Sequence, residues 1–387
     1  MEPFDHKRHA DLLEDNRHRV LAAENFEEAD RVPVTIGLGG PYYAWLFGHT
    51  LAEYYNDLGT MLNIQVKGLK WRLSWLKDDV TNIGVWLDVG SIAEGIVFGC
   101  EIRMPNETNP WLSPWITPCV RSLEDLDRLE VPDPRSHRGI RKHYEKVEKF
   151  KELARKNYGD IQASGGLQIH PPVSAAGSLL GPERLYSWLY KYPSEMHRLF
   201  KKLKETFEVL KEYDDAVTNA EKGSIHLADD HSGYLNRALY EKFALPYNLE
   251  LYEAYGEKHR GLHMDSHMDH ITDIIRDVYK VEDVDVGVEN DIRLIAEAFK
   301  GRVVFNGNAN WRVLVNAPLE AIEKEVEECI FYSAPGGGYI FDNGGETYIG
   351  LPPEKLKYEV DYAKKVGEYP IRIKNFKYIP SARENDI

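Results

Sequence analysis

Cysteine is scarce in this sequence, and the few cysteines lie far apart. The 387 residues include only Cys100, Cys119 and Cys329. An odd number at such wide spacing argues against a disulfide framework and is typical of a protein in a reducing compartment. No two cysteines form a CxxC pair, which excludes a thiolate-rich zinc site. We therefore expect no disulfide framework and a cytoplasmic protein.

Long apolar runs are also missing. No window approaches the roughly 18 consecutive apolar residues that indicate a membrane-spanning helix. Residues 1–21 carry charges throughout and lack the apolar stretch of a signal peptide. We therefore expect neither a membrane span nor a targeting segment.

The sequence has fewer basic than acidic residues. Lysine and arginine number 48 against 63 aspartates and glutamates, which gives a formal net charge of −15. A polyanion repels phosphate backbones and anionic membrane surfaces, so binding to nucleic acid or to membranes is disfavoured. A small-molecule ligand, or a partner protein with a basic patch, is compatible with this charge.

Three motifs of common ligand-binding and catalytic folds are absent as well. No GxGxxG follows a predicted first strand, no GxxxxGK[ST] loop occurs and no GxSxG elbow occurs. Their absence argues against a dinucleotide site, a nucleotide phosphate loop and a serine-hydrolase nucleophile.

The sequence does contain a repeated order of buried strand, polar tip and amphipathic helix. Helices are predicted at 5–28, 236–258, 269–280 and 291–300, in a long region that begins at Pro182, and near Leu319. Strands are predicted at 31–36, 85–89, 95–99, 160–165, 224–228, 261–264, 284–288, 303–305 and 338–341. This alternation indicates a parallel sheet.

The predicted fold class is α/β, and the predicted architecture is a (β/α)₈ TIM barrel. At least four strands end in His, Asp or Asn, and in a barrel such tips converge on one face. We expect a single domain over 1–387, with an N-terminal helical segment at 1–30, the barrel at 31–370 and a tail at 371–387. An open doubly wound sheet is the alternative.

The densest cluster of candidate site residues follows the strand at 261–264. Side chains two positions apart on a strand point the same way, so His263 and Asp265 are expected to project together into the barrel mouth. Imidazole and carboxylate suit zinc or another divalent ion. The alternative is that one histidine packs in the core while the others, with Asp269, cap the next helix.

A second cluster lies where the strand at 224–228 ends. His226, Asp229 and Asp230 are candidates, with the two carboxylates in catalytic roles and His226 in substrate binding. Adjacent carboxylates can hold a metal ion, orient a polar substrate or raise one another's pKa. Alternatively, one of them caps the following turn.

Further candidates stand at other predicted strand tips. Glu346 follows two glycines that allow a tight turn, and we assign it as a metal ligand. Residues that we expect to contact substrate are His170, Asn308, Tyr42 and Trp86. The alternatives are an ordinary turn for Glu346, loop hydrogen bonding for Asn308, and a place in the core or a subunit interface for the aromatic residues.

Several segments resemble the superfamily of uroporphyrinogen decarboxylases and corrinoid-dependent methyltransferases. The similar segments are Asn16 to Ala23 with Asp30 to Val34, Pro118 to Pro134 with its SLEDL and VPDP motifs, Leu227 to Asp230, Leu262 to Asp265, Asn306 to Asn308, Pro335 to Ile340 and Leu351 to Glu354. They occur in consistent order between about 16 and 360. The resemblance implies a TIM barrel.

The resemblance also implies a choice between two chemistries. Decarboxylases of this kind carry an arginine-rich loop near the first strand, which grips the carboxylates of the substrate. The corresponding segment here, Gly37 to Tyr43, contains no arginine. The resemblance therefore favours the methyltransferase branch.

Methyltransferases of the superfamily hold zinc through a histidine and two cysteines. His263 matches the histidine, Asp265 stands at the first cysteine position, and Glu346 stands next to the second, at Gly345. A site of histidine and carboxylates suits an oxygen donor such as a methoxy-aromatic ether. We predict metal-assisted transfer of a methyl group from a small donor molecule to cobalamin or another corrinoid on a partner protein.

Two other functions remain open. One is a decarboxylase or lyase for a small carboxylated substrate, with Asp229 or Asp230 and His263 as acid and base. The other is a corrinoid- or tetrapyrrole-binding protein without catalysis. The sequence also leaves a homodimer open.

Overall fold

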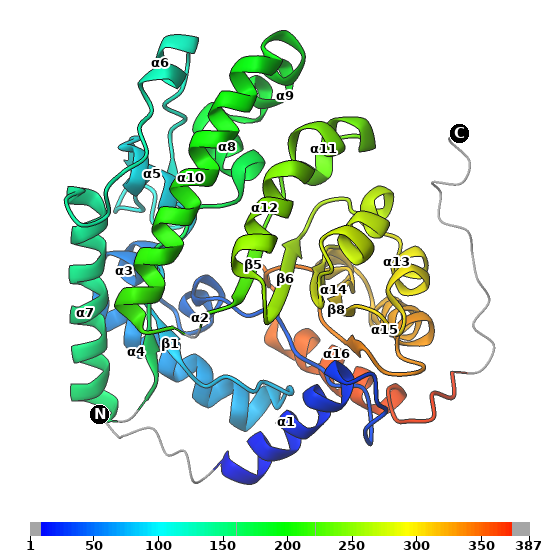
Figure 1. Cartoon of the computed structure of the whole chain (residues 1–387). Helices are drawn as coiled ribbons and strands as arrows, with labels where there is room; N and C mark the ends of the chain where they lie inside the picture. Colours follow the sequence, from blue (N-terminus) through cyan, green and yellow to red (C-terminus); the bar gives the residue numbers. More distant parts are fainter. Residues whose placement is uncertain (1–8, 160, 221, 374–387) are drawn as a thin grey trace.

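Parallel strands at the centre of the molecule are surrounded by helices (Figure 1). The computed structural model describes residues 9–159, 161–220 and 222–373. Its largest sheet has the order β5-β6-β7-β8-β9, and all neighbours are parallel. The strands are β5 (Ser224–Ala228), β6 (His259–Met264), β7 (Asp283–Val286), β8 (Val304–Gly307) and β9 (Tyr339–Ile340).

Shorter strand segments from the first half of the chain continue the ring. Val34 pairs in parallel with Phe341, which attaches the predicted first strand to the sheet beside β9. A parallel pair is formed by β1 (Val85–Trp86) and β4 (Ala163–Ser164). The order of these segments and their helices is that of a TIM barrel, so the predicted architecture is confirmed.

A side chain takes the place of a neighbouring strand at one position of the ring. The amide of Gln65 donates to the carbonyl oxygen of Trp86 at 2.9 Å and accepts from its N–H at 2.9 Å. Gln65 is almost fully buried. It thus satisfies both backbone groups of a strand edge that would otherwise be unpaired.

The helices before β5 include the predicted long helical region, which divides at Pro193. They are α1 (Ala10–Glu24), α2 (Gly40–Leu46), α3 (Leu51–Asn56), α4 (Leu58–Trp71), η2 (Arg72–Leu76), α5 (Ala93–Phe98), α6 (Leu123–Arg128), α7 (Arg138–Tyr158), α8 (Pro172–Leu180), α9 (Pro182–Lys191) and α10 (Pro193–Thr218).

The helices after β5 are shorter on average. They are η3 (Ser232–Tyr234), α11 (Arg237–Phe243), α12 (Leu245–Tyr255), η4 (Asp269–Ile271), η5 (Ile274–Val278), α13 (Ile292–Phe299), α14 (Trp311–Asn316), α15 (Leu319–Ser333) and α16 (Pro353–Val366). Among the described residues, none of the helices has the length and apolar character that a membrane span needs.

The N-terminal helix is tied to the barrel by a buried carboxylate. Asp79 has no exposed side-chain surface, and it pairs with Arg31 at 2.5 Å and with Arg19 of α1 at 3.4 Å. Its Oδ2 also accepts a hydrogen bond from the backbone N–H of Val34. The predicted helix at 5–28 is therefore present as α1, while residues 1–8 and 374–387, including most of the predicted tail, lie outside the described residues.

The two faces of the barrel strands differ sharply in polarity. Ile225 and Leu227 of β5 are buried on the face that packs against the helices. The alternate residues face the interior of the barrel, where branched apolar side chains usually pack in layers. In this protein the inner positions carry His226, His259, His263, Asp283, Asp285 and Asn306.

One strand prediction is wrong. Residues 95–98 belong to the helix α5, and Gly99 follows as its C-cap with φ of +71°. A short apolar run such as Ile96, Val97 and Phe98 has no periodicity that separates a strand from a buried helix.

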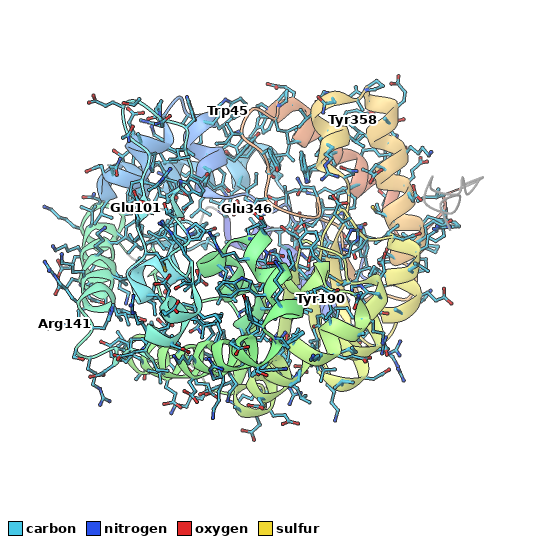
Figure 2. All side chains as sticks on the ribbon, turned by 90° about the horizontal axis from the view of Figure 1, so that it is seen from above. Trp45, Glu101, Arg141, Tyr190, Glu346 and Tyr358 are labelled. Carbon is cyan, nitrogen blue, oxygen red and sulfur yellow. A yellow bond between two sulfur atoms is a disulfide. The ribbon has the colours of Figure 1, made fainter. Side chains whose placement is uncertain are left out.

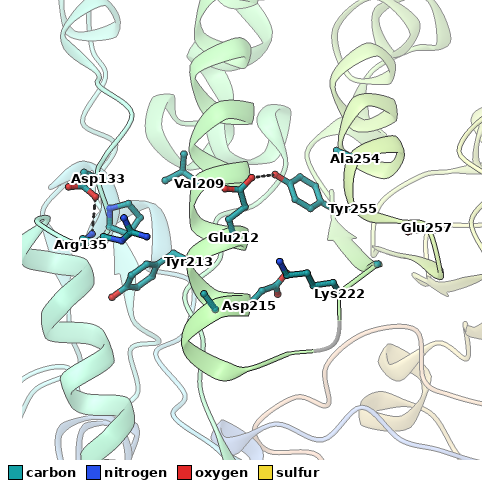
Figure 3. A pocket seen from close by; sticks show the side chains of 13 residues that line it. Asp133, Arg135, Val209, Glu212, Tyr213, Asp215, Lys222, Ala254, Tyr255 and Glu257 are labelled. Carbon is teal, nitrogen blue, oxygen red and sulfur yellow. Dashed lines mark hydrogen bonds between the residues drawn. The ribbon is translucent and has the colours of Figure 1, made fainter.

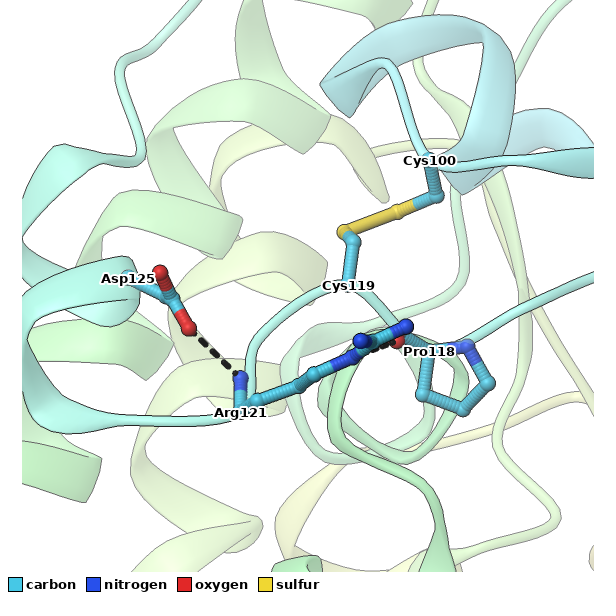
Figure 4. The surroundings of a disulfide bond; sticks show 5 residues. All are labelled: Cys100, Pro118, Cys119, Arg121 and Asp125. Atoms are coloured by element: carbon cyan, nitrogen blue, oxygen red, sulfur yellow. Dashed lines mark hydrogen bonds between the residues drawn. A yellow bond between two sulfur atoms is a disulfide. The ribbon is translucent and has the colours of Figure 1, made fainter.

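The wide spacing of the cysteines argued against a disulfide framework, but one disulfide is present. Cys100 and Cys119 are joined, and Cys329 is free and buried. The two cysteines flank the antiparallel pair β2 (Ile102–Arg103) and β3 (Trp115–Ile116), which brings the chain before β2 beside the chain after β3 (Figure 4). A separation of 19 residues in sequence therefore becomes 5.3 Å between Cα atoms.

Candidate active site

The candidate site lies at the C-terminal ends of β5 and β6, the face on which TIM barrels carry their catalytic residues. The register pairs Ala228 with His263, which brings the residues after both strands together. The backbone N–H of Asp265 donates to Oδ1 of Asp230 at 2.7 Å. The hydroxyl of Ser266 donates to the carbonyl oxygen of Asp230 at 2.6 Å. Asp230 is thereby fixed beside Asp265.

Three side chains form the one candidate metal cluster found among the described residues. Asp230, His263 and Asp265 each offer one ligand atom, and these atoms lie within 4.8 Å of one another. Of these three, His263 and Asp265 are predicted metal ligands, whereas Asp230 is predicted to be catalytic. Because Asp230 extends the same strand face as His226 and Ala228, it points into the mouth.

The histidine of the cluster is oriented by Asp285 from the neighbouring strand β7. Nδ1 of His263 lies 3.1 Å from Oδ2 of Asp285, and Nε2 lies 3.7 Å from Oδ2 of Asp265. Burial alone would lower the pKa of His263, but the bond with Asp285 and the charges of Asp265 and Asp230 outweigh it and raise the pKa to about 9. Nδ1 is thus occupied by a carboxylate, and Nε2 faces the other two members of the cluster, as in histidines that bind metal ions.

Asp229 stands apart from Asp230 although the two are adjacent. It is fully buried on the opposite face, and it accepts hydrogen bonds from Ser174 at 2.6 Å, Ser232 at 2.5 Å and Asn248 at 2.7 Å. Burial raises the pKa of Asp229, against these hydrogen bonds. The structure therefore places Asp229 as an anchor between β5 and the helices, away from the mouth.

The half-buried His170 pairs with the fully buried Glu94 of α5. Both Nδ1 and the backbone N–H of His170 contact Oε1 of Glu94, at 2.8 Å and 2.9 Å. Burial lowers the pKa of His170, but Glu94, Asp230 and Asp229 together raise it above its usual value. Glu94 thus fixes the ring of His170, the predicted substrate contact, through the contact of Nδ1 with its carboxylate.

Glu346 lies at the mouth but outside the cluster of three. Figure 2 shows it near the centre of the molecule when seen from above. Burial raises the pKa of Glu346, and the charges of Asp88 and Asp265 raise it further, while the charge of His263 lowers it. Glycine at position 39 leaves room for the carboxylate of Glu346, because a Cβ there would lie 3.3 Å from Oε1 of Glu346.

The other residues predicted to contact substrate lie elsewhere. His226 sits deeper in the barrel, with Nε2 at 4.0 Å from Oδ2 of Asp285. Tyr42 has no exposed surface, and its hydroxyl donates to the carbonyl oxygen of Leu351. Asn308 is buried and joins two loops through the carbonyl oxygens of Gly287 and Asn290. The side chains of Tyr42 and Asn308 therefore serve the packing of the barrel.

Trp86 is half-exposed, but it faces a different cavity. This cavity has a volume of about 480 Å³ and lies where Gln65 covers the edge of β1, with Leu38, Arg72 and Ser164 among its lining residues. None of the three cluster residues lines it.

Sequence reasoning did not single out Asp285, Glu94 or Asp88. A signal for Asp285 was present, because Asp283 and Asp285 alternate with Val284 and Val286, which marks one polar and one apolar face of a strand. Glu94 and Asp88 carried no such signal. Asp88 accepts from the hydroxyl of Tyr54 at 3.0 Å and from the N–H of Gly90 at 2.9 Å.

A further large cavity lies on the opposite face. Its volume is about 600 Å³, and its lining includes Lys222 and Glu257, which precede β5 and β6 (Figure 3). Glu212 and Tyr255 form a hydrogen bond within it. Because catalytic residues of TIM barrels gather at the other ends of the strands, this cavity is not the candidate active site.

Comparison with protein families gives a match over most of the chain. The family model of uroporphyrinogen decarboxylase (URO-D) matches residues 15–366. The uroporphyrinogen decarboxylase of Anaeromyxobacter sp. (strain Fw109-5) is 27% identical over 258 residues, which cover 64% of this chain and 70% of the relative. The enzyme of the same name from Chloroherpeton thalassium is 24% identical over 301 residues, covering 74% and 79%.

Comparison with solved structures gives the same fold. A methyltransferase from Methanosarcina mazei matches with a TM-score of 0.67 at 20% sequence identity, and the match covers 90% of this chain and 98% of that protein. The barrel described above is therefore shared across almost the whole of both chains.

Proposed function

This chain belongs to the uroporphyrinogen decarboxylase family, and within that family we propose that it is a methyltransferase. The proposed reaction moves a methyl group from a small methoxy-aromatic donor to a corrinoid carried by a partner protein. A divalent metal ion, zinc in the first instance, assists it.

The observation that carries this proposal is the cluster of Asp230, His263 and Asp265. One imidazole nitrogen and two carboxylate oxygens within 4.8 Å are a suitable donor set for zinc, which takes nitrogen and oxygen ligands and keeps an open position in catalytic sites. Glu346 stands close enough for its charge to act on the cluster, and it is the candidate for a further ligand or for an acid.

Each residue of the site has a chemical task in this proposal. When bound, the ion supplies Lewis acidity to the ether oxygen of the donor. Asp285 orients His263 so that Nε2 faces the ligand position, and the N–H of Asp265 fixes the carboxylate of Asp230. The oxygen that loses its methyl group takes up a proton, and Glu346, whose pKa is raised, is placed to donate it.

Decarboxylation of a polycarboxylate is the less supported alternative. The relatives are named as decarboxylases, which supports this alternative. A polycarboxylate substrate, however, needs cationic side chains at the mouth. Arg237 pairs with Asp273 and Glu241, and Arg312 pairs with Glu289. The two arginines are therefore already engaged by carboxylates.

The first experiment is the metal content of protein purified without chelators or a histidine tag, by elemental mass spectrometry. About one zinc ion per chain is expected for the wild type, and none for His263→Ala or Asp265→Ala. Asp283→Asn removes a carboxylate from the same inner face and is the matched control, with metal retained. Wild-type protein without metal would contradict the proposed metal site. Metal retained in both alanine variants would contradict it as well.

The second experiment tests the reaction itself. Methoxy-aromatic compounds are incubated with the protein and a reduced corrinoid acceptor, and the demethylated phenol is measured. Turnover in the wild type and none in His263→Ala supports the proposal. Release of carbon dioxide from a carboxylated aromatic compound would favour the decarboxylase, and tight corrinoid retention without turnover of either substrate would favour a binding protein.

A further inference from the structure

A cavity opens on the flank of the barrel and contains none of the candidate metal ligands in its lining. Its volume is about 610 Å³, within the range of small-molecule sites, and it lies between α3, α4, α5 and α7. These helices are neighbours at one side of the molecule in Figure 1. In Figure 2, Arg141 of α7 lies at the outer edge of the molecule, whereas Glu346 lies near the centre. None of Asp230, His263 and Asp265 lines this flank cavity.

The floor of the flank cavity is apolar. Met61, Leu87 and Ile92 line it and are 1%, 5% and 6% exposed. Half-buried apolar side chains, Ile96, Ile102 and Met104 among them, continue the wall toward the surface. A lining of this kind favours an apolar body of a ligand, because contact removes apolar surface from water.

The rim of the flank cavity is cationic. Lys142 and Lys146 lie one turn apart on α7, both are exposed, and both line the cavity. On the same helix Lys151 pairs with Glu148 at 3.0 Å, whereas neither Lys142 nor Lys146 forms an ion pair within the part of the chain that the structure describes. In a protein with a net charge of −15, two adjacent lysines without a carboxylate partner are positioned for an anionic ligand.

The carboxylate at the inner end of the flank cavity does not compete for these lysines. Asp88 lines the cavity, but it accepts from the hydroxyl of Tyr54 and the N–H of Gly90. Tyr55 lies at the same end of the cavity. Burial and then the charges of Asp88 and Glu346 raise the pKa of Tyr55, so this end is within electrostatic reach of Glu346. Glu145, which stands between the two lysines in the sequence of α7, does not line the cavity, so Asp88 at the inner end is the only carboxylate among the described residues that line it.

We propose that the flank cavity binds an organic anion with an apolar body, such as an aromatic carboxylate. The body occupies the floor formed by Met61, Leu87 and Ile92, and the carboxylate lies between Lys142 and Lys146. This site is additional to the proposed methyl-transfer site and does not depend on its metal ion.

The test measures binding of naphthalene-2-carboxylate to the full chain by isothermal titration calorimetry, beside the neutral analogue 2-naphthalenemethanol. The carboxylate is expected to bind more tightly. Lys142→Gln/Lys146→Gln should weaken carboxylate binding about tenfold and remove the preference over the alcohol. The matched control is Lys149→Gln/Lys156→Gln, which removes the same charge from exposed positions of α7 that do not line the cavity.

Two further variants locate the bound molecule. Met104→Trp fills the flank cavity and should abolish binding of both compounds, with folding checked by circular dichroism. His263→Ala should leave binding unchanged. Equal affinity of the two compounds, no saturable binding to the wild type, full binding to Lys142→Gln/Lys146→Gln or loss of binding in His263→Ala would each overturn the proposal.

Discussion

Asp285 accepts the hydrogen of His263 Nδ1 across two neighbouring strands, at 3.1 Å. The contact is fixed by register, since His263 and Asp285 are paired positions of β6 and β7. A carboxylate that holds the far nitrogen of a histidine sets both the ring orientation and the basicity of the other nitrogen. The metal affinity of the site is therefore expected to depend on a residue that does not bind the ion.

Asp285→Asn tests this dependence. The amide keeps a hydrogen-bond acceptor for Nδ1 but loses the charge, so zinc affinity should fall by roughly 10- to 100-fold. Competition with a chelator of known affinity measures the change. Asp283→Asn, two positions away on the same strand face, is the control and should leave affinity unchanged. Equal affinity of wild type and Asp285→Asn would contradict the orienting role.

Alanine variants of the adjacent residues Asp229 and Asp230 should have different effects, one on stability and the other on metal binding. Asp229→Ala leaves Ser174, Ser232 and Asn248 without their acceptor in a buried position, and should lower the free energy of unfolding by about 3 kcal/mol or more. Asp230→Ala should cost about 1 kcal/mol or less, because its side chain faces the mouth.

Urea unfolding and metal content measure this pair of variants together. Asp230→Ala is expected to be stable and without metal. Asp229→Ala is expected to retain metal for as long as it is folded. The reverse result would assign Asp229 to the metal site and Asp230 to the packing.

His143 gives the protein a pH dependence that is independent of the metal site. Its side chain is 3% exposed and lies 2.8 Å from the carbonyl oxygen of Gly166, and burial lowers its pKa to about 4. In the unfolded chain the pKa returns to about 6.5, so the unfolded state takes up a proton first as the pH falls. The stability that neutral His143 provides is complete above pH 6.5 and is lost as the pH falls toward 4.

His143→Gln measures this contribution. Glutamine keeps a donor for Gly166 but does not titrate. Between pH 6.5 and 4 the wild type should lose roughly 3 kcal/mol more of its unfolding free energy than His143→Gln. Urea titrations at several pH values give the difference. Parallel curves for the two proteins would show that His143 is not held neutral by the fold.

The cysteine pairing is tested by counting thiols. The protein unfolded in denaturant without reductant should show one reactive thiol per chain, that of Cys329, and three after reduction. Cys329→Ser should show none before reduction. Three thiols in the unreduced wild type would mean that Cys100 and Cys119 lie close but are not joined.

Much of the fold was predictable from the sequence because strands and polar tips alternate strongly in the second half. The strand predicted at 224–228 is β5 without change. The first half was less predictable, because Val85–Trp86 and Ala163–Ser164 are only two residues long and rely on one another and on Gln65 for their backbone partners. Short strands leave too few residues for a period to be recognised.

The site was predictable in its residue types but not in its partners. Strand alternation placed His263 and Asp265 together, and the same rule separates Asp230 from Asp229, although both were assigned to catalysis. The pairing of His263 with Asp285 depends on the register between two strands, which a single sequence does not contain. Glu94 reaches His170 from a helix that the sequence suggested to be a strand.

Because the interior of the barrel is polar, the two faces of each strand have different roles. Ile225, Leu227 and Leu262 make the apolar contacts that hold strands to helices, whereas His226, Asp283 and Asp285 face a solvated interior. The barrel is therefore stabilised mainly by the packing of its strands against the surrounding helices. Because the inner positions do not take part in the packing between strands and helices, their side chains can be substituted at little cost to the fold. Along each strand, one set of alternate residues can change the chemistry of the site, and the other set keeps the fold.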